Sequence, residues 1–402
     1  MKRKEFLVLI LMSLMLTLIA GCIESVTPDV TETVRYVATN GDNAHDGSEE
    51  FPWRTIQYAL TTIPKSGTII VKDGVYNESI SFPSVWPTKK IILQSVNGDS
   101  STTIIGYSNL PTVTCSNSFP GTTLEGFTIT HNPGDNGSGI YISAGCLNID
   151  NCTISNNSAT FGGGIYNKCI LSITSSTISN NSADQGEGGG IYNEGTLTIN
   201  RGTIISNSAH EGGGIYNCGT LTITEESTIS HNFSFAEGGG IHNCWGTLTI
   251  NSSTISHNSV DYSYGGGIHN FGTLTINSST ISHNFSAYDG GGIHNLGTLT
   301  INSSTISHNS AAFGGGIGNR WGGTLTINSS TISYNSAHEG GGIYFFLGSE
   351  TATIGSSGEE NTICGNYKTG NTPSLDQQIR GESGSLYDTY NNTNFISASC
   401  PL

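Results

Sequence analysis

Residues 188–232 read GGGIYNEGTLTINRGTIISNSAHEGGGIYNCGTLTITEESTISHN. This stretch holds two copies of one unit: three glycines, I-[Y/H]-N, a turn, T-L-T-I, a second turn, S-T-I-S-x-N and a variable loop. The unit recurs from about Gly139 to Asn366, and successive copies start 24 to 27 residues apart. A unit of this size cannot bury its own apolar face and must stack on its neighbours, so the period predicts a solenoid.

The pattern inside the unit indicates strands. In T-L-T-I the residues alternate, with Leu197 and Ile199 on one side and Thr196 and Thr198 on the other, which is the period of a strand. Three short strands and three turns in about 25 residues make one triangular coil of a parallel β-helix. Each strand then lies about 4.8 Å from its copies in the coils above and below. The predicted class is all-β, with about a dozen coils.

Two asparagine columns are expected to face inward. Stacked amides can bond along a column, and asparagine tolerates the left-handed backbone that a corner needs. One column is Asn167, Asn193, Asn217, Asn243, Asn270, Asn295 and Asn319, and the other is Asn181, Asn207, Asn232, Asn258, Asn284, Asn309 and Asn335.

The unit resembles the repeats of the polymorphic outer membrane protein family, in which Phe-x-x-Asn precedes Gly-Gly-Ala-Ile. Here Ile229-Ser230-His231-Asn232 and Gly238-Gly239-Gly240-Ile241 stand in those places, so isoleucine replaces the phenylalanine and a third glycine replaces the alanine. The wider resemblance is to pectin-lyase-like β-helices, and it implies a right-handed coil. The resemblance covers residues 139–366, and the likeness to polymorphic outer membrane protein repeats implies a surface protein.

The start of the chain has the features of an export signal. Residues 1–22 read MKRKEFLVLILMSLMLTLIAGC, a basic start followed by an apolar run. Ile19-Ala20-Gly21-Cys22 resembles a prokaryotic lipobox, which implies removal of residues 1–21 and lipidation of Cys22. We expect an exported protein anchored at the cell surface or outer envelope, whose membrane contact is this lipid alone. The alternatives are an ordinary signal peptide and an uncleaved anchor.

The remaining boundaries follow from the repeat. Residues 22–34 form an acidic tether, and residues 35–138 an N-terminal cap with irregular first coils. In that cap Ile56, Ala59, Leu60 and Ile63 have helical spacing, which predicts a short helix over the first coil. Residues 139–366 form the regular repeats, and residues 367–402 fit no slot and form a C-terminal cap.

Charge limits the functions. The formal net charge of the 402 residues is −16, so nucleic acid and anionic lipid surfaces are poor partners. Between residues 139 and 345 the basic residues other than histidine are Lys168, Arg201 and Arg320. The polysaccharide lyases and epimerases that the wider resemblance brings in need a basic residue and a cationic groove. We therefore expect no catalytic residues. The glycines recur in every coil with no helix after them, so we also expect no nucleotide site and no cofactor.

The cysteines are expected to pair. Eight cysteines follow Cys22 in a chain predicted to be exported, which favours disulfides. Cys218 and Cys244 occupy the same slot of adjacent coils and are candidates for one bridge. Cys364 and Cys400 are candidates for another. The alternative is a ladder of unpaired thiols.

Stacked ionisable residues raise the question of metal binding. His231, His257, His283 and His308 share one slot, and His242, His269 and His294 share another. Stacked imidazoles can bind Zn²⁺, although we interpret both slots as variable outward positions. Glu187, Glu211 and Glu237 directly precede the glycines, where stacked carboxylates could recruit Ca²⁺. The alternative, which we favour, is that these carboxylates extend into water.

One turn carries an apolar stripe. After the asparagine of I-x-N, successive coils place Trp245, Phe271, Leu296 and Trp321 in the same turn. Such a stripe predicts a partner-binding or sugar-stacking surface, unless the rings fold back over the threonine face. The expected function is structural or adhesive, with a glycan or an envelope or surface protein as the partner and no catalysis. The alternative is a polysaccharide lyase or epimerase of the pectin-lyase-like superfamily.

Overall fold

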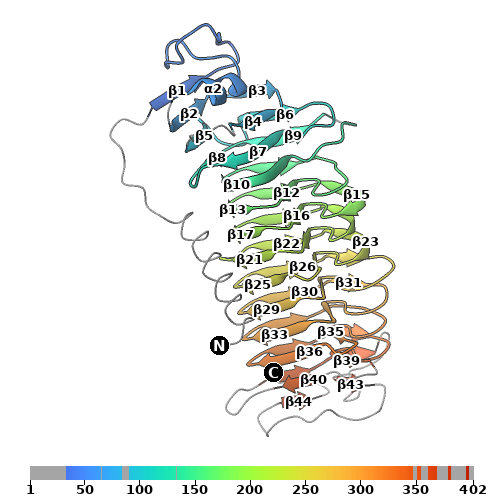
Figure 1. The fold of residues 1–402 in the computed structure, drawn as a ribbon. Helices are drawn as coiled ribbons and strands as arrows, with labels where there is room; N and C mark the ends of the chain where they lie inside the picture. The colour runs from blue at the N-terminus through green and yellow to red at the C-terminus, as the bar shows by residue number, and fades with distance from the viewer. Residues whose placement is uncertain are drawn as a thin grey trace, which may run out of the picture.

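The computed structural model describes residues 33–64, 66–83, 90–132, 134–346, 351–354, 361–368, 379–381 and 395–397. The predicted signal peptide, Cys22, most of the tether and Cys400 lie outside these residues. The described chain winds into a parallel β-helix whose coils stack along one axis from the N-terminal end to the C-terminal end (Figure 1). The predicted fold class is confirmed.

The T-L-T-I segments form the first ladder, in which each strand pairs in parallel with its copy one coil away. Its strands are β1 (Thr33–Val37), β2 (Gly67–Val71), β5 (Ile91–Ser95), β8 (Thr123–Glu125), the second half of β10 (Ile140–Asp150), β13 (Ile170–Thr174), β17 (Thr196–Asn200), β21 (Thr220–Thr224), β25 (Thr247–Asn251), β29 (Thr273–Asn277), β33 (Thr298–Asn302), β36 (Thr324–Asn328) and β40 (Thr351–Ile354).

The S-T-I-S segments form a second parallel ladder of 13 strands, in agreement with about a dozen coils. Its strands are β3 (Gly74–Asn77), β6 (Thr102–Gly106), β9 (Thr128–His131), β11 (Thr153–Ser155), β14 (Thr177–Ser179), β18 (Thr203–Ile205), β22 (Thr228–Ser230), β26 (Thr254–Ser256), β30 (Thr280–Ser282), β34 (Thr305–Ser307), β37 (Thr331–Ser333), β41 (Thr362–Cys364) and β44 (Phe395–Ser397).

The I-x-N segments form the third ladder, called here the I-x-N ladder. Its strands are β4 (Ile80–Phe82), β7 (Val113–Ser118), the first half of β10, β12 (Ile165–Asn167), β16 (Ile191–Asn193), β20 (Ile215–Asn217), β24 (Ile241–Asn243), β28 (Ile268–Asn270), β32 (Ile293–Asn295), β35 (Ile317–Asn319), β39 (Ile343–Phe345) and β43 (Ile379–Gly381).

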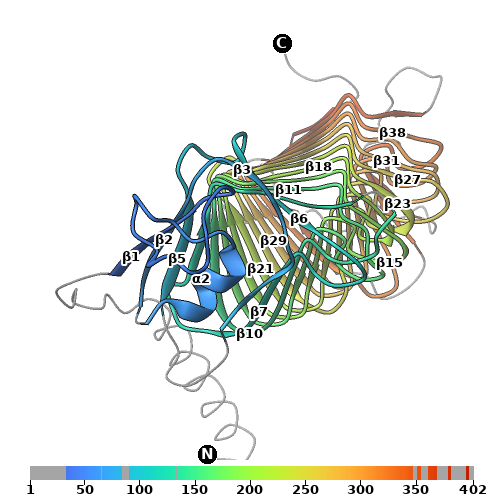
Figure 2. The ribbon, with the colours of Figure 1, turned by 90° about the horizontal axis from the view of Figure 1, so that it is seen from above.

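A fourth ladder is an addition to the three predicted strands per coil. The variable loop before the glycines pairs with its own copies and protrudes from the triangular body (Figure 2). We call it the loop ladder, and its strands are β15 (Ser182–Glu187), β19 (Ser208–Glu211), β23 (Phe233–Glu237), β27 (Ser259–Val260) and β31 (Phe285–Ser286), followed near the C-terminal end by the pair β38 (Ser336–Ala337) and β42 (Tyr367–Lys368).

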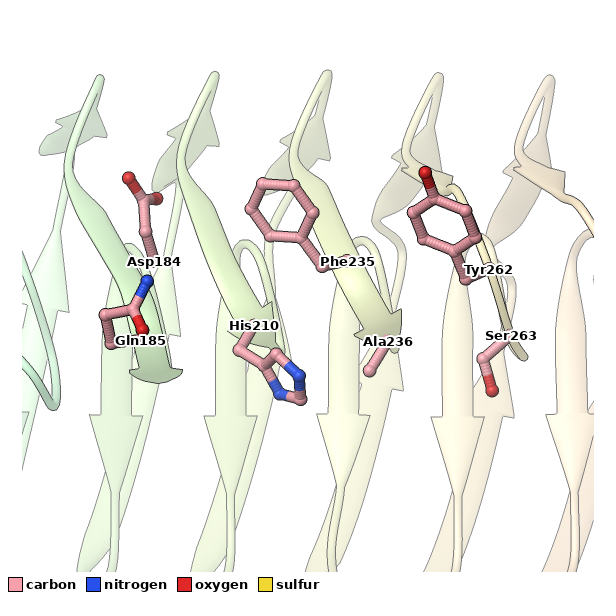
Figure 3. Close-up of a pocket in the computed structure, with 7 residues that line it drawn as sticks. All are labelled: Asp184, Gln185, His210, Phe235, Ala236, Tyr262 and Ser263. Atoms are coloured by element: carbon pink, nitrogen blue, oxygen red, sulfur yellow. The ribbon is translucent and has the colours of Figure 1, made fainter.

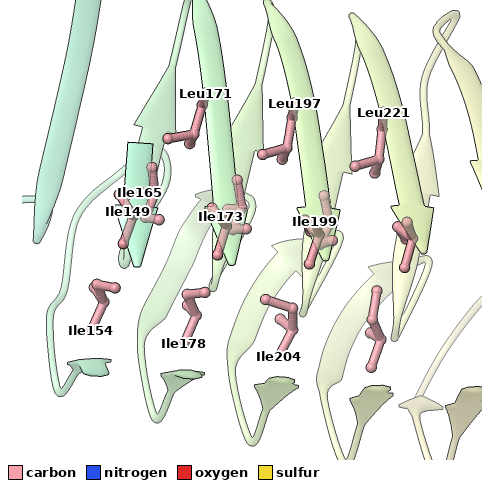
Figure 4. Close-up of a cluster of buried hydrophobic side chains, with 14 of the residues drawn as sticks. Ile149, Ile154, Ile165, Leu171, Ile173, Ile178, Leu197, Ile199, Ile204 and Leu221 are labelled. Atoms are coloured by element: carbon pink, nitrogen blue, oxygen red, sulfur yellow. The ribbon is translucent and has the colours of Figure 1, made fainter. Parts of the chain in front are cut away.

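The solenoid interior is filled by stacked aliphatic side chains. Each coil contributes isoleucine from the I-x-N ladder, leucine and isoleucine from T-L-T-I, and isoleucine from S-T-I-S (Figure 4). In one coil these residues are Ile191, Leu197, Ile199 and Ile204, all of which have no exposed surface. Because every coil presents the same shapes at the same places, the columns pack without a change of register.

Both asparagine columns face inward, as predicted. Asn232 donates from Nδ2 to Oδ1 of Asn258 at 3.0 Å and to the carbonyl of Ile204 at 3.0 Å. Asn270 donates from Nδ2 to Oδ1 of Asn295 at 2.7 Å. These four asparagines are at most 1% exposed. The amides therefore hold neighbouring coils together while satisfying buried corner carbonyls.

The predicted N-terminal helix is α2 (Ile56–Thr62), which lies at the first coils (Figure 1). It buries Ile56, Ala59 and Leu60 against the core, and Thr55 caps its N-terminus by accepting from the amide of Tyr58. No helix among the described residues is long and apolar enough to span a membrane.

The described parts of the predicted C-terminal cap extend the solenoid. β43 pairs in parallel with β39, and β44 pairs with β41. Residues 379–381 and 395–397 therefore add strands to the I-x-N ladder and to the second ladder, although their sequence lost the repeat.

The cysteines differ from the predicted pairing. Cys218 and Cys244 are free thiols, so the bridge predicted between them is not formed. In a parallel, in-register ladder the two Cβ atoms keep the strand spacing of about 4.8 Å, whereas a disulfide needs about 3.5–4.5 Å. Cys364 is disulfide-bonded, and its predicted partner Cys400 lies outside the described residues.

Candidate functional site

Two columns of side chains meet along one corner of the β-helix. The first holds the residue directly before the glycines, which pairs with its copies along the loop ladder. The second holds the middle residue of I-x-N, which points out of the solenoid. We call the first the pre-glycine column, and its residues are Glu187, Glu211, Glu237, Tyr264, Asp289, Phe313 and Glu339. We call the second the ring column, and its residues are Tyr166, Tyr192, Tyr216, His242, His269, His294, Gly318 and Tyr344.

The glycines between the columns allow them to meet. Gly238 has φ 64, a left-handed backbone that other residues adopt at a cost. A Cβ at Gly239 would lie 2.5 Å from the carbonyl oxygen of Ser259, so only glycine fits there. The chain can therefore double back within three residues and lay a pre-glycine side chain over the outer face of the I-x-N ladder.

Carboxylates and imidazoles are in contact in the middle coils. His242 Nδ1 lies 3.4 Å from Oε2 of Glu211 and 3.8 Å from Oε2 of Glu237. His269 Nδ1 lies 3.1 Å from the same oxygen of Glu237. The imidazole side chains of His242 and His269 are only 4% and 1% exposed, and the two carboxylates are about three-quarters buried.

This arrangement refines one interpretation from the sequence and corrects another. His242, His269 and His294 point out of the solenoid but are buried, because the loop ladder folds over them. The sequence predicted their outward direction but not that another segment covers them. Glu211 and Glu237 do not extend into water, because the in-register loop strands hold them against the rings.

Burial sets the protonation of this cluster. It lowers the pKa of His242 well below its usual value, and the neighbouring His269 adds to the effect. It also raises the pKa of Glu211, to which the carboxylates of Glu237 and Glu187 contribute by repulsion. His242 is therefore a neutral imidazole near pH 7, with a lone pair available on one ring nitrogen.

A different arrangement occupies the same corner further along. Arg320 pairs through Nε with the fully buried carboxylate of Asp289. Burial raises the pKa of Asp289 to about 7, and Arg320 acts in the opposite direction. The guanidinium carbon of Arg320 also lies over four aromatic rings, 4.2 to 5.7 Å from the centroids of Tyr288, Phe313, Tyr344 and Phe346.

The other two basic side chains of the regular repeats also have acidic neighbours. Lys168 Nζ lies 3.9 Å from Oε2 of Glu194, and Arg201 Nη1 lies 3.7 Å from Oε2 of Glu225. Each of the three basic side chains between residues 139 and 345 is thus close to a carboxylate. The Lys168 and Arg201 side chains are partly exposed, whereas that of Arg320 is buried.

The second histidine slot is exposed, as predicted. His231, His257, His283 and His308 stack face to face with ring centroids 4.9 Å apart and interplanar angles of 1 to 4°. Their backbone is left-handed, with φ between 55 and 59. Modest burial and the two neighbouring imidazoles lower the pKa of His257.

The predicted apolar stripe is not continuous. Trp245 and Trp321 are 76% and 60% exposed. Phe271 is half-buried because its ring packs over His269, with centroids 4.7 Å apart, and Leu296 is also half-buried. Phe271 and Leu296 therefore pack against the body of the solenoid, whereas Trp245 and Trp321 are exposed and separate from each other.

A shallow groove runs over the loop ladder next to this corner. It has a volume of about 810 Å³ and crosses four successive coils. Phe235 and Tyr262 project beside each other from adjacent coils, with polar side chains along the same surface (Figure 3). The lining residues are Asp184, Gln185, His210, Phe235, Ala236, Tyr262 and Ser263.

Residues 151–168 and 175–194 match the Chlamydia polymorphic membrane protein repeat. The resemblance to these repeats is confirmed for the two matched segments. Among solved structures it is similar to pectate lyase Pel9A, with 16% identity and a TM-score of 0.42 over 94% of this chain and 93% of that chain. The pectin methylesterase from carrot shares 14% identity with a TM-score of 0.33, over 93% of this chain and 90% of that chain. XylC, solved in complex with xylose, shares 11% identity with a TM-score of 0.35, over 92% of this chain and 86% of that chain. At such identities these likenesses concern the fold alone. No curated protein matches the chain in sequence.

The matched segments cover parts of two coils, and the groove lies over the loop ladder. Sequence reasoning missed the groove because the loop varies in length. The sequence signal for the loop ladder was a residue two positions after each corner asparagine from Asn181 to Asn335, which is small in most of these coils and buried in all of them. These residues are Ala183, Ala209, Ser234, Val260, Ser286, Ala311 and Ala337.

Proposed function

We propose that this protein is a surface β-helix that binds an extended, neutral glycan along the loop-ladder groove without cleaving it. The observation that carries this is the pair Phe235 and Tyr262, which are 40% and 80% exposed on adjacent coils above one groove. Aromatic faces stack on sugar rings, and nearby amide, carboxylate and hydroxyl groups bond to sugar hydroxyls. Asp184, Gln185 and Ser263 supply such groups.

Charge supports a neutral ligand. The chain has a formal net charge of −16, and Asp184 lies in the groove itself. An acidic polysaccharide would be repelled by both. Proton abstraction beside a uronate needs a free base. The regular repeats offer few candidates, because Arg320 is buried against Asp289 and Lys168 and Arg201 each have an acidic neighbour. This argues against the lyase or epimerase alternative.

The repeats support a surface location. Polymorphic membrane protein repeats are typical of outer-membrane surface proteins, and lipidation at Cys22 would hold this chain there. The long stack of coils would then present the groove away from the membrane.

The test is binding of the purified protein to a panel of neutral and uronate-containing polysaccharides, measured by isothermal titration calorimetry. We expect a neutral glycan to bind, and Phe235→Ala and Tyr262→Ala each to weaken it about tenfold, as loss of one stacked ring implies. Tyr107→Ala is the matched control, because Tyr107 is 48% exposed outside the groove. Binding only to uronate polymers, or release of unsaturated uronates, would contradict the proposal.

The exposed tryptophans provide a second set of variants. Trp245→Ala with Trp321→Ala tests the prediction from sequence that this turn contacts a partner. If the double variant loses glycan binding while Phe235→Ala keeps it, the binding face is the tryptophan turn and not the groove.

A further inference from the structure

We infer that Glu211, Glu237, His242 and His269 form a binding site for one divalent transition-metal ion, with Zn²⁺ as the best match. The site joins two pre-glycine carboxylates to two ring-column imidazoles across adjacent coils. It does not depend on the proposed glycan function.

The donor atoms have the spacing of a first coordination shell. Zn²⁺ binds imidazole nitrogen and carboxylate oxygen at about 2.0–2.2 Å, which places tetrahedral ligand atoms about 3.3 Å apart. The three nitrogen-to-oxygen distances are 3.1, 3.4 and 3.8 Å. Donor atoms of Glu237, His242 and His269 all lie within 4.8 Å of one another. Small side-chain rotations bring such a set onto one ion.

The imidazoles have unused nitrogen atoms. Nδ1 of His242 and both ring nitrogens of His269 are buried and have no hydrogen-bond partner. A buried polar atom without a partner destabilises the fold, and a metal ion would supply that partner.

The corner lacks a positive charge at this point of the stack. Further along, the buried acid Asp289 has Arg320 as its cation. Glu187, Glu211 and Glu237 stack on one another, and among the described residues the ion-pair partners of Glu211 and Glu237 are histidines. An added cation would balance the negative charge of Glu211 and Glu237, as Arg320 balances that of Asp289.

The types of ligand atom indicate which cation would bind at this site. Ca²⁺, which the stacked glutamates alone suggested, takes oxygen ligands, whereas imidazole favours Zn²⁺, Ni²⁺ or Cu²⁺. The ring of Phe271 packs 5.9 Å from His242 and 4.7 Å from His269, so one side of the site is closed to water. The partly exposed carboxylates of Glu211 and Glu237 leave the other side open for the ion to arrive.

The experiment is a titration of the chelator-treated full-length protein with ZnCl₂ by isothermal titration calorimetry. Co²⁺ substitution followed by visible absorption is the second readout. We expect one tight site, an intense tetrahedral Co²⁺ spectrum and a rise of the melting temperature with Zn²⁺. Glu237→Gln and His269→Gln should each weaken Zn²⁺ binding at least tenfold and remove the cobalt spectrum. Glu237→Gln keeps the side-chain shape, so it tests binding even if His269→Gln fails to fold.

His283→Gln is the matched control, because His283 belongs to the exposed ladder. It should leave the tight site unchanged. Three results would overturn the inference: no Zn²⁺ binding, equal binding by Glu237→Gln, or loss of the site in His283→Gln. Binding of Ca²⁺ in place of transition metals would also overturn it.

Discussion

The inner asparagine column makes a quantitative prediction at Asn270. Its Nδ2 donates to Oδ1 of Asn295 at 2.7 Å and to the carbonyl of Gly272 at 3.2 Å, and its Oδ1 accepts from Nδ2 of Asn243 at 2.7 Å. The side chain has no exposed surface. In Asn270→Ala, the groups that lose their partner are shielded from bulk water.

The cost can be worked from these contacts. Asn243 keeps a bond from Nδ2 to the carbonyl of Gly246 at 3.0 Å, so it is not left without a partner. Oδ1 of Asn295 loses the amide that Asn270 donated and stays buried, which costs about 1–3 kcal/mol. We expect the free energy of unfolding to fall by about that amount.

Asn277→Ala is the matched control in the same coil. Asn277 belongs to an outer asparagine ladder, in which it donates to Asn251 at 2.8 Å and accepts from Asn302 at 2.8 Å. These residues are half-buried, so water can replace the amide, and we expect a loss within about 0.5 kcal/mol. Urea unfolding measures both variants, and amide hydrogen exchange in β28 and β32 locates the loss. If Asn270→Ala and Asn277→Ala lower the free energy of unfolding equally, burial of the inner column does not determine how much its amides stabilise the fold.

Three further predictions concern other features. Asp289→Asn leaves the buried Arg320 without its counter-charge and should cost about 3–5 kcal/mol in urea unfolding, and adding Arg320→Met should recover part of the loss. Because the pKa of His257 is lowered in the folded state, the unfolded chain binds a proton more readily than the folded chain. The free energy of unfolding should therefore be highest above about pH 6.5, with respect to this group, and should decrease as the pH falls below that value. His283→Gln removes one repelling imidazole and should raise the His257 pKa in an NMR titration, whereas an unchanged value would exclude coupling along the ladder. Cys22→Ala should abolish acyl labelling and release the protein from the membrane fraction, and labelling that survives would contradict the lipidated anchor.

The fold was predictable because the same strand pattern recurs in every copy of the repeat. The period gave the coils, and strict alternation in T-L-T-I gave the inward side. The fixed position of asparagine predicted the amide columns. The column predicted from Asn181 to Asn335 is present and continues to Asn157 at one end and Asn366 at the other. The outward position of the ladder around His257 was predicted from the variability of its slot.

The candidate site was less predictable because its parts come from segments with different periodicities. The ring column repeats strictly, so its outward direction could be read from alternation. Its burial depends on the loop ladder, whose length varies and whose pairing breaks register between Ala183 and Glu187. Alternation predicts which face a side chain takes, but it cannot predict that another segment of the same coil will cover that face. The outward direction of His269 was therefore predictable, but its burial was not.

Gly318 shows how one coil can change the chemistry of the corner without disturbing the fold. It takes the ring-column slot that His242, His269 and His294 fill in the preceding coils. A Cβ at Gly318 would overlap the carboxylate of Asp289, so histidine in this slot would exclude the pair of Asp289 with Arg320. The backbone ladder is unaffected, because only the outward side chain differs. A solenoid can thus hold its core constant while each coil selects an acid–imidazole pair, an aromatic contact or an acid–arginine pair on the same outer corner.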